Sequence, residues 1–296
     1  MIINPALYPL LTPMNSTMDS TIPANLQNIA WFAFYEAANK WMSKFQSLTT
    51  KDKVLGILFQ DLANDYWHLL GDFQYFELER NIRPVQIETF CRVRRYIENF
   101  YKLKNLTNDP DFLLVINAKE NNKEKDERFP DKYEKHKDPN GFLTLRGLGE
   151  CLRANDEGII KDFDSDVLFE VEGINGKLGG SLYSVNQKNY ITVDGKSILH
   201  PIDILSGIAK TANPYVHGGK IWIGFADIDK LHDQIQGIFY MCLECLHIAL
   251  KEMMKLRPLS FENTPYCSYN SNYILEDLYE CQREIIKTNL FCYQYN

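Results

Sequence analysis

Residues 227–258, DIDKLHDQIQGIFYMCLECLHIALKEMMKLRP, carry the clearest helical pattern in the chain. Apolar side chains recur there every three or four residues, which is the spacing of one buried stripe along a helix. The members of this stripe are Ile228, Leu231, Ile235, Phe239, Cys242, Leu246, Ala249 and Met253. Asp227 is placed to cap the first turn, and Pro258 ends the helix because it lacks a backbone N–H.

The same periodicity predicts further helices before and after this one. Residues 25–45 and 50–76 each have one apolar face, so we expect them to pair as an antiparallel hairpin, with Thr50 as N-cap of the second. Pro84 suits the first turn of a third helix that ends near residues 105–110. The other predicted helices cover about 141–158, 201–212 and 273–289. The predicted fold class is therefore mainly α, a bundle of six or seven helices.

The segments without helical periodicity set the expected domain organisation. Residues 1–24 contain four prolines and predict an irregular arm, while 25–296 are expected to form a single helical domain. Residues 119–138 balance acidic against basic side chains and predict a charged loop. Residues 166–197 are rich in glycine and predict a small β-hairpin or an irregular insertion. Its candidate strands are Val167–Val171, Leu182–Val185 and Tyr190–Val193.

Charge and cysteine content exclude several classes of protein. The net charge of -7 argues against broad, charge-driven binding of nucleic acid, although it permits a local basic site. No apolar run is long enough to span a bilayer, and the start of the chain does not resemble a signal peptide. Seven scattered cysteines fit a reducing compartment, so a cytoplasmic protein without a membrane partner is expected. Cys242 and Cys245 have the CxxC spacing but lie within a predicted helix, which favours a core position.

Two acid-x-x-His pairs occur on predicted helices. They are Asp65 with His68 and Glu244 with His247, and this spacing is typical of carboxylate-bridged di-iron bundles. Glu36, with Glu88 or Glu98, could supply the further carboxylates that an iron or manganese site needs. Glu244 and His247 lie roughly 140° to 200° from the apolar stripe of their helix at 100° per residue. That angle favours a solvated polar face over a metal site. Asp65 and His68 flank the apolar stripe of their helix together with Asp61 and Asp72, so a solvated face is expected for this pair as well.

One turn carries a candidate for general base catalysis. The sequence Asn213-Pro214-Tyr215-Val216-His217-Gly218-Gly219 places an imidazole at a tight bend between two helices. Such a histidine can accept a proton from a substrate, or it can stabilise the turn through a backbone hydrogen bond. The spacing of this histidine alone favours the structural role over general base catalysis.

The turn Tyr215-Val216-His217-Gly218 resembles a turn of the HEPN-like helical superfamily, where it precedes the last long helix. Residues 92–112, RVRRYIENFYKLKNLTNDPDF, are similar to the Arg-rich helix of the same proteins. Catalytic members are metal-independent ribonucleases with an Arg, a polar residue, three others and a His. The resemblance implies that His217 and Asn213 match the His and the polar residue, whereas Ala212 replaces the Arg.

The resemblance therefore implies a binding or interaction module with a degenerate ribonuclease-like site and no cofactor. It also implies a role in prokaryotic stress response or phage defence, with RNA or a nucleotide as the ligand. Tyr215 is expected to contribute to binding, and the cations that could replace the missing Arg are Lys210, Arg94 and Arg95. Two alternatives remain open: a metal-dependent, di-iron-like enzyme, and a structural or oligomeric scaffold. A homodimer is expected, paired through the long C-terminal helices.

Overall fold

The computed structural model describes most of the chain between residues 48 and 256. The described ranges are 48–78, 83–117, 130–139, 143–153, 156–180, 182–183, 189–216, 228–256 and residue 283. Within them the chain forms nine helices and one two-stranded hairpin, which confirms the mainly α fold class. The predicted arm 1–24 and the predicted helix 25–45 lie outside the described residues. Among the described helices, none combines the length and the apolar composition that crossing a bilayer requires.

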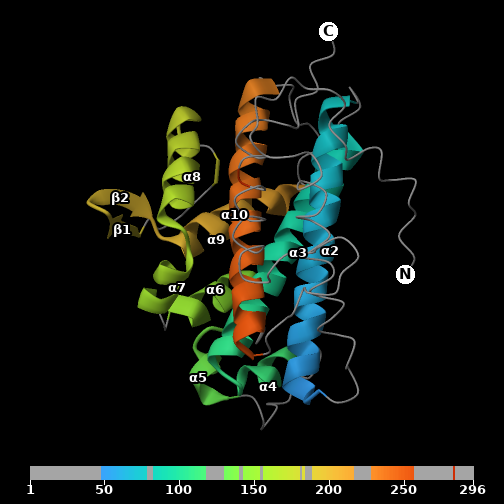
Figure 1. Ribbon diagram of the computed structural model, residues 1–296, viewed down its shortest axis with the longest axis vertical. Helices are drawn as coiled ribbons and strands as arrows, with labels where there is room; N and C mark the ends of the chain where they lie inside the picture. Colours follow the sequence, from blue (N-terminus) through green and yellow to red (C-terminus); the bar gives the residue numbers. More distant parts are fainter. Residues whose placement is uncertain are drawn as a thin grey trace, which may run out of the picture.

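Helix α10 (Ile228–Leu256) is the centre of the structure. It stands between α8 (Ser165–Lys177) and α2 (Thr50–Leu78), and it also contacts α3 (Arg83–Asn108) (Figure 1). Every residue from 237 to 250 is buried, so the helix is covered all round. The sequence predicted one buried stripe and one solvated face. The polar face is covered as well, because Glu244, which lies off the stripe, is buried and accepts a hydrogen bond from Asp164, the residue before α8.

Helices α2 and α3 pack together and against α10. The Tyr66 ring of α2 meets Phe239 of α10 edge to face, with ring centroids 6.0 Å apart. The Tyr96 hydroxyl of α3 donates a hydrogen bond to the carbonyl oxygen of Cys242 over 2.8 Å. Helix α2 begins at Thr50, but its capping side chain is that of Thr49, whose Oγ1 accepts from the backbone N–H of Asp52 at 3.2 Å.

Four short helices follow α3; in Figure 1 the first two lie at the lower end of the bundle and the other two lie farther up. They are α4 (Phe112–Asn117), α5 (Asp131–Glu134), α6 (Leu145–Arg153) and α7 (Asp156–Asp162). Helix α5 falls within the segment that was predicted as a charged loop. Its Tyr133 packs edge to face on Phe112, with centroids 5.1 Å apart, which holds this single turn against the start of α4. The helix predicted at 141–158 corresponds to α6 and the first residues of α7.

Residues 165–177 form helix α8 and correct the prediction of a strand at Val167–Val171. Val167, Leu168 and Val171 are buried at helical spacing, and the Asp164 side chain caps the helix by accepting from the backbone N–H of Asp166 at 2.8 Å. The helix ends at Lys177, and the chain then turns through Gly179 and Gly180, whose φ angles of 68° and 73° favour glycine.

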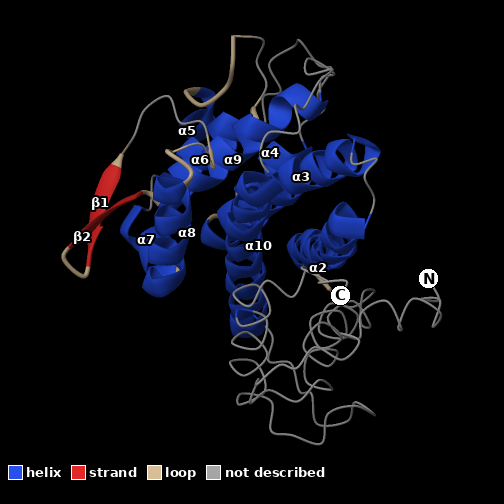
Figure 2. Cartoon of the chain, turned by 90° about the horizontal axis from the view of Figure 1, so that it is seen from above, coloured by secondary structure: helices blue, strands red, loops and turns tan. Residues whose placement is uncertain are grey.

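The predicted strand Tyr190–Val193 is confirmed as β1, which pairs antiparallel with β2 (Lys196–Leu199). Asp194 and Gly195 form the two-residue turn, with φ angles of 48° and 75° that suit a tight hairpin. The hairpin lies at the side of the helices, next to α8 (Figure 2).

Helix α9 (Pro201–Val216) follows the hairpin and packs against α3 and α6. It runs four residues beyond the predicted end at Ala212, so the predicted turn at Pro214 is wrong. Pro214 lies within the last turn of the helix, where the missing N–H removes only one backbone bond.

Candidate functional site

The C-terminal end of α9 carries the described part of the histidine motif. Asn213 is half-buried and Lys210 is exposed. Ala212, at the position that the resemblance assigns to the motif Arg, is 0% exposed and belongs to the core. A side chain at position 212 therefore points into the protein and away from the surface that carries Lys210. His217 and the side chain of Tyr215 lie outside the described residues.

The predicted arginines, Arg94 and Arg95, lie on α3, which packs against α9. The Tyr101 hydroxyl of α3 lies 3.2 Å from the carbonyl oxygen of Ile202 and 3.0 Å from Oγ of Ser206. From behind α10, the end of α9 emerges beside α3 (Figure 1). Arg94 of α3 is half-buried and Arg95 is exposed. The name α9–α3 surface is used below for Lys210 and Asn213 of α9 together with Arg94 of α3, the helix that packs against α9.

Arg95 binds a carboxylate of the neighbouring helix. Its Nε donates to Oδ2 of Asp65 over 2.8 Å, and its Nη2 donates to Oδ1. Nη1 of Arg92 lies 3.5 Å from the same carboxylate. The hydrogen bond to Asp65 raises the pKa of Arg95. Arg95 therefore joins α3 to α2, and this role differs from the predicted replacement of the motif Arg.

The Asp65 and His68 pair is divided between the interior and the surface. Asp65 was predicted on a solvated face, but its side chain is 2% exposed and lies beneath Arg92 and Arg95. His68 lies at the surface. Its pKa is lowered, chiefly by the partial burial of its ring and secondly by the nearby positive charge of Arg92. Arg92 and Arg95 explain why Asp65 is buried and not solvated, because they cover its carboxylate and neutralise its charge. Both belong to α3, so the apolar pattern of α2 does not reveal them.

The second pair, Glu244 and His247, is buried, which corrects the prediction of a solvated face. Glu244 is 1% exposed and His247 is 6% exposed. Oε2 of Glu244 accepts a hydrogen bond from the backbone N–H of Asp164 over 3.1 Å. Burial raises the pKa of Glu244 to about 8 and lowers the pKa of His247 to about 4. Both side chains are therefore held predominantly neutral at pH 7.

The two acid-x-x-His pairs have separate surroundings. Asp65 contacts the arginines of α3, whereas Glu244 contacts the first turn of α8. Within the described ranges, no three His, Cys, Asp or Glu side chains come together in a way that could hold a metal ion. Glu36 lies outside those ranges. Of the other two candidate carboxylates, Glu88 forms an ion pair with Arg92 at 2.6 Å and Glu98 forms one with Lys102 at 2.6 Å.

Cys242 and Cys245 are 2% and 0% exposed, as predicted for core cysteines. Burial raises the pKa of both thiols, which keeps them protonated. A thiol in this state is a poor nucleophile and a poor metal ligand.

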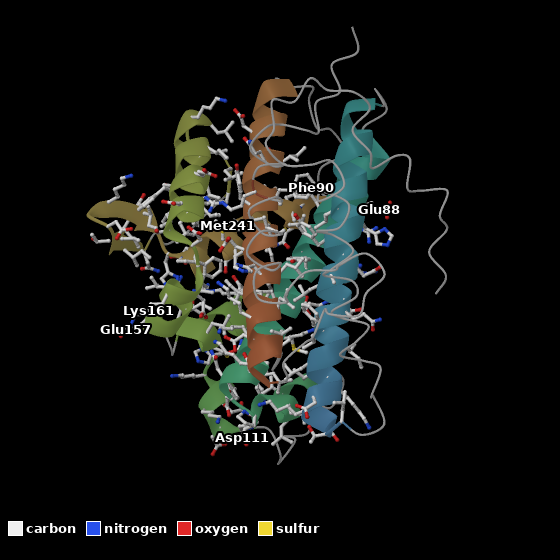
Figure 3. The ribbon with its side chains drawn as sticks, viewed as in Figure 1. Glu88, Phe90, Asp111, Glu157, Lys161 and Met241 are labelled. Atoms are coloured by element: carbon white, nitrogen blue, oxygen red, sulfur yellow. The ribbon has the colours of Figure 1, made fainter. Side chains whose placement is uncertain are left out.

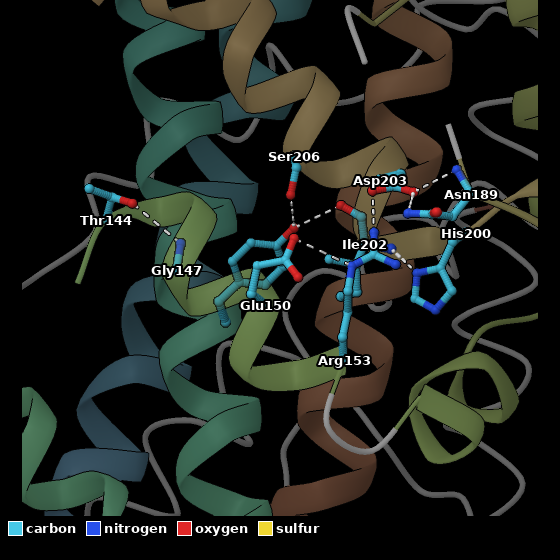
Figure 4. A network of polar contacts seen from close by, with 10 residues as sticks. Thr144, Gly147, Glu150, Arg153, Asn189, His200, Ile202, Asp203 and Ser206 are labelled. Atoms are coloured by element: carbon cyan, nitrogen blue, oxygen red, sulfur yellow. Dashed lines mark hydrogen bonds and ion pairs between the residues drawn. The ribbon is translucent and has the colours of Figure 1, made fainter. Parts of the chain in front are cut away.

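A polar network at the start of α9 was not predicted (Figure 4). Asp203 binds Arg153 of α6 through one carboxylate oxygen, and its other oxygen accepts from Asn189 Nδ2 over 3.0 Å. His200 caps α9, since its Nδ1 accepts from the backbone N–H of Ile202 at 3.1 Å. The signal in the sequence was a possible cap before Pro201 and an acid in the first turn. The network joins α6, the hairpin and α9.

A buried lysine near the C-terminal end of α3 joins this helix to two others. Nζ of Lys104 lies 2.6 Å from Oδ2 of Asp162 in α7 and 2.5 Å from Oε1 of Glu252 in α10. The Lys104 side chain is 6% exposed. Burial alone would raise the pKa of Glu252, but the hydrogen bonds and positive charges of Lys104 and Lys255 together outweigh it and lower that pKa. Sequence periodicity does not reveal this group, because its members come from three distant segments.

These contacts define a mainly helical protein with a central buried helix and several polar groups that join its neighbours. Comparison of the chain with models of protein families, with curated proteins and with solved structures gives no match. The α9–α3 surface is the candidate functional site because it carries Asn213, the described polar residue of the histidine motif, together with the cations Lys210 and Arg94.

Proposed function

We propose that the chain is a HEPN-like binding module that holds a phosphate-bearing ligand, RNA or a nucleotide, on the α9–α3 surface without cleaving it. The observation that carries this proposal is the complete burial of Ala212. A ribonuclease that uses the 2'-hydroxyl needs a base and a cation to stabilise the charge on the phosphate. With position 212 in the core, α9 offers Asn213 and Lys210 but no cation at the motif position.

The surroundings of the arginines support binding over catalysis. Arg95 is bound to Asp65, so its charge is partly neutralised and its position is fixed by α2. Lys210 is the exposed cation closest in sequence to Asn213. A single lysine and a half-buried asparagine suit contacts to phosphate and sugar oxygens, which contribute to affinity without specifying a sequence.

The experiment is a titration of a fluorescently labelled, single-stranded RNA with full-length protein at low salt, followed by fluorescence anisotropy. The wild type is expected to bind, and the double substitution Lys210→Ala and Asn213→Ala to weaken binding by about tenfold or more. Lys161→Ala is the matched control, since Lys161 is an exposed lysine on α7 (Figure 3). Equal affinity for the double variant and the wild type would refute the proposal.

His217→Ala tests the remaining part of the motif. A binding module should lose affinity in this variant while RNA stays intact with either protein. If the wild type cleaves RNA and His217→Ala abolishes cleavage, the protein is an enzyme and the non-catalytic proposal is wrong.

A further inference from the structure

Glu244 brings a carboxyl group into the interface between α10 and α8. Its side chain is 1% exposed, and only one of its oxygens has a hydrogen bond within the described part of the chain. That bond comes from the backbone N–H of Asp164, the residue immediately before α8. A buried carboxylate with one oxygen unsatisfied is costly, whereas a neutral carboxylic acid is tolerated.

The charged groups around Glu244 come from three segments. Asp164 caps α8 with Oδ1, while its Oδ2 lies 3.3 Å from Nη1 of Arg283. Asp164 disfavours a negative charge on Glu244, and Arg283 and Lys251 favour it. His247 lies one turn along α10 and is also buried. Burial is the largest influence on Glu244 and outweighs both cations.

We propose that Glu244 is a proton-operated latch between α10 and the first turn of α8. As a neutral acid it closes the interface. When the proton leaves to solvent, the carboxylate needs water or a further donor, and the first turn of α8 loosens to supply it.

The pH window follows from Glu244 and His247 together. Glu244 has a folded pKa of about 8 against the ordinary 4.5, so it contributes stability that is lost as the pH rises through about 8. His247 has a folded pKa of about 4 against the ordinary 6.5, so its contribution is lost as the pH falls below 6.5. Between 4.5 and 6.5 the two dependences oppose each other. Between pH 6.5 and pH 8, Glu244 is the member of this pair whose protonation differs between the folded and the unfolded chain, so folding takes up one proton there.

The test is urea unfolding of the full chain at pH 6.5 and pH 8. The unfolding equilibrium constant of the wild type is expected to rise by about tenfold across this interval, as one linked proton requires. Glu244→Gln imitates the neutral acid and should reduce that rise to less than about twofold. Glu157→Gln is the matched control on the exposed face of α7, and it should retain the rise of the wild type.

Hydrogen exchange of the backbone amides at residues 164–168 supplies a local readout that does not depend on two-state unfolding. After correction for intrinsic exchange, these amides should lose protection between pH 6.5 and 8.5 in the wild type and keep it in Glu244→Gln. An equal pH dependence in the two proteins, in either measurement, would overturn the proposal. A wild type without any pH dependence in this interval would overturn it as well.

Discussion

Arg95 of α3 donates hydrogen bonds from Nε and Nη2 to the two carboxylate oxygens of Asp65 in α2. The carboxylate is buried, while the Arg95 side chain is 59% exposed. This geometry holds the two helices at a fixed register on one side of the central helix.

Removing the charge of Asp65 should therefore loosen the α2–α3 pair. Asp65→Asn keeps the shape but weakens charge-assisted hydrogen bonds, so we expect the free energy of unfolding to fall by about 1 to 3 kcal/mol. Urea denaturation measures the change. Glu88→Gln is the control, because Glu88 is 63% exposed and its ion pair with Arg92 is a surface contact that should change stability by less than about 0.5 kcal/mol. Equal losses in both variants would contradict the assigned role of Asp65.

Lys104 should be among the most sensitive positions of α3. Lys104→Met leaves Asp162 and Glu252 without their shared cation, and breaking such a buried pair typically costs about 3 to 5 kcal/mol. Thermal and urea denaturation measure the loss. Lys102→Met is the matched control on the same helix, since Lys102 pairs with Glu98 near the surface and is 30% exposed. If Lys104→Met unfolds at the same urea concentration as the wild type, the buried ion pair does not stabilise the fold.

Ala212→Arg restores the residue of the catalytic motif, yet it should not create a ribonuclease. The position is 0% exposed, so the substitution forces a long charged side chain into the core, and we expect a loss of about 3 kcal/mol or more. Lys210→Arg, on the exposed face of the same helix, should leave stability within about 0.5 kcal/mol. A stable Ala212→Arg protein that cleaves RNA would show that position 212 faces a catalytic site.

Two glycines should respond to alanine in opposite directions. Gly173 lies within α8 with no atom within 4 Å of a Cβ, so Gly173→Ala should stabilise the protein by about 0.5 to 1 kcal/mol. Gly195 has a φ of 75° in the hairpin turn, and Gly195→Ala should destabilise by about 1 kcal/mol. Differential scanning calorimetry distinguishes the two signs. A stabilising Gly195→Ala would contradict the turn geometry.

Periodicity predicted the helices whose apolar residues lie on a single face. Helix α3 and the strand Tyr190–Val193 follow their expected ranges, since Pro84 and the Asp194-Gly195 turn mark their limits locally. Helix α8 was missed because its buried Val and Leu residues were assigned to a strand. The capping Asp164 was the signal for a helix.

The buried polar groups could not be predicted from one helix at a time. Glu244 lies off the apolar stripe of α10, and the sequence predicted that this face meets water. The face is instead covered by the start of α8 and by Arg283, which come from other parts of the chain. Asp65 is covered in the same way by two arginines of the neighbouring helix. Placement of such groups depends on tertiary contacts, and a sequence pattern carries little information about them.

The most direct test of the proposed function follows one labelled RNA through two gels. Wild-type protein is mixed with the RNA without added metal, and the mixture is analysed on a native gel and then on a denaturing gel. A binding module that lacks the motif cation should retard the RNA on the native gel and leave it at full length on the denaturing gel. RNA that is shortened, or RNA that migrates as the free strand, would contradict the account.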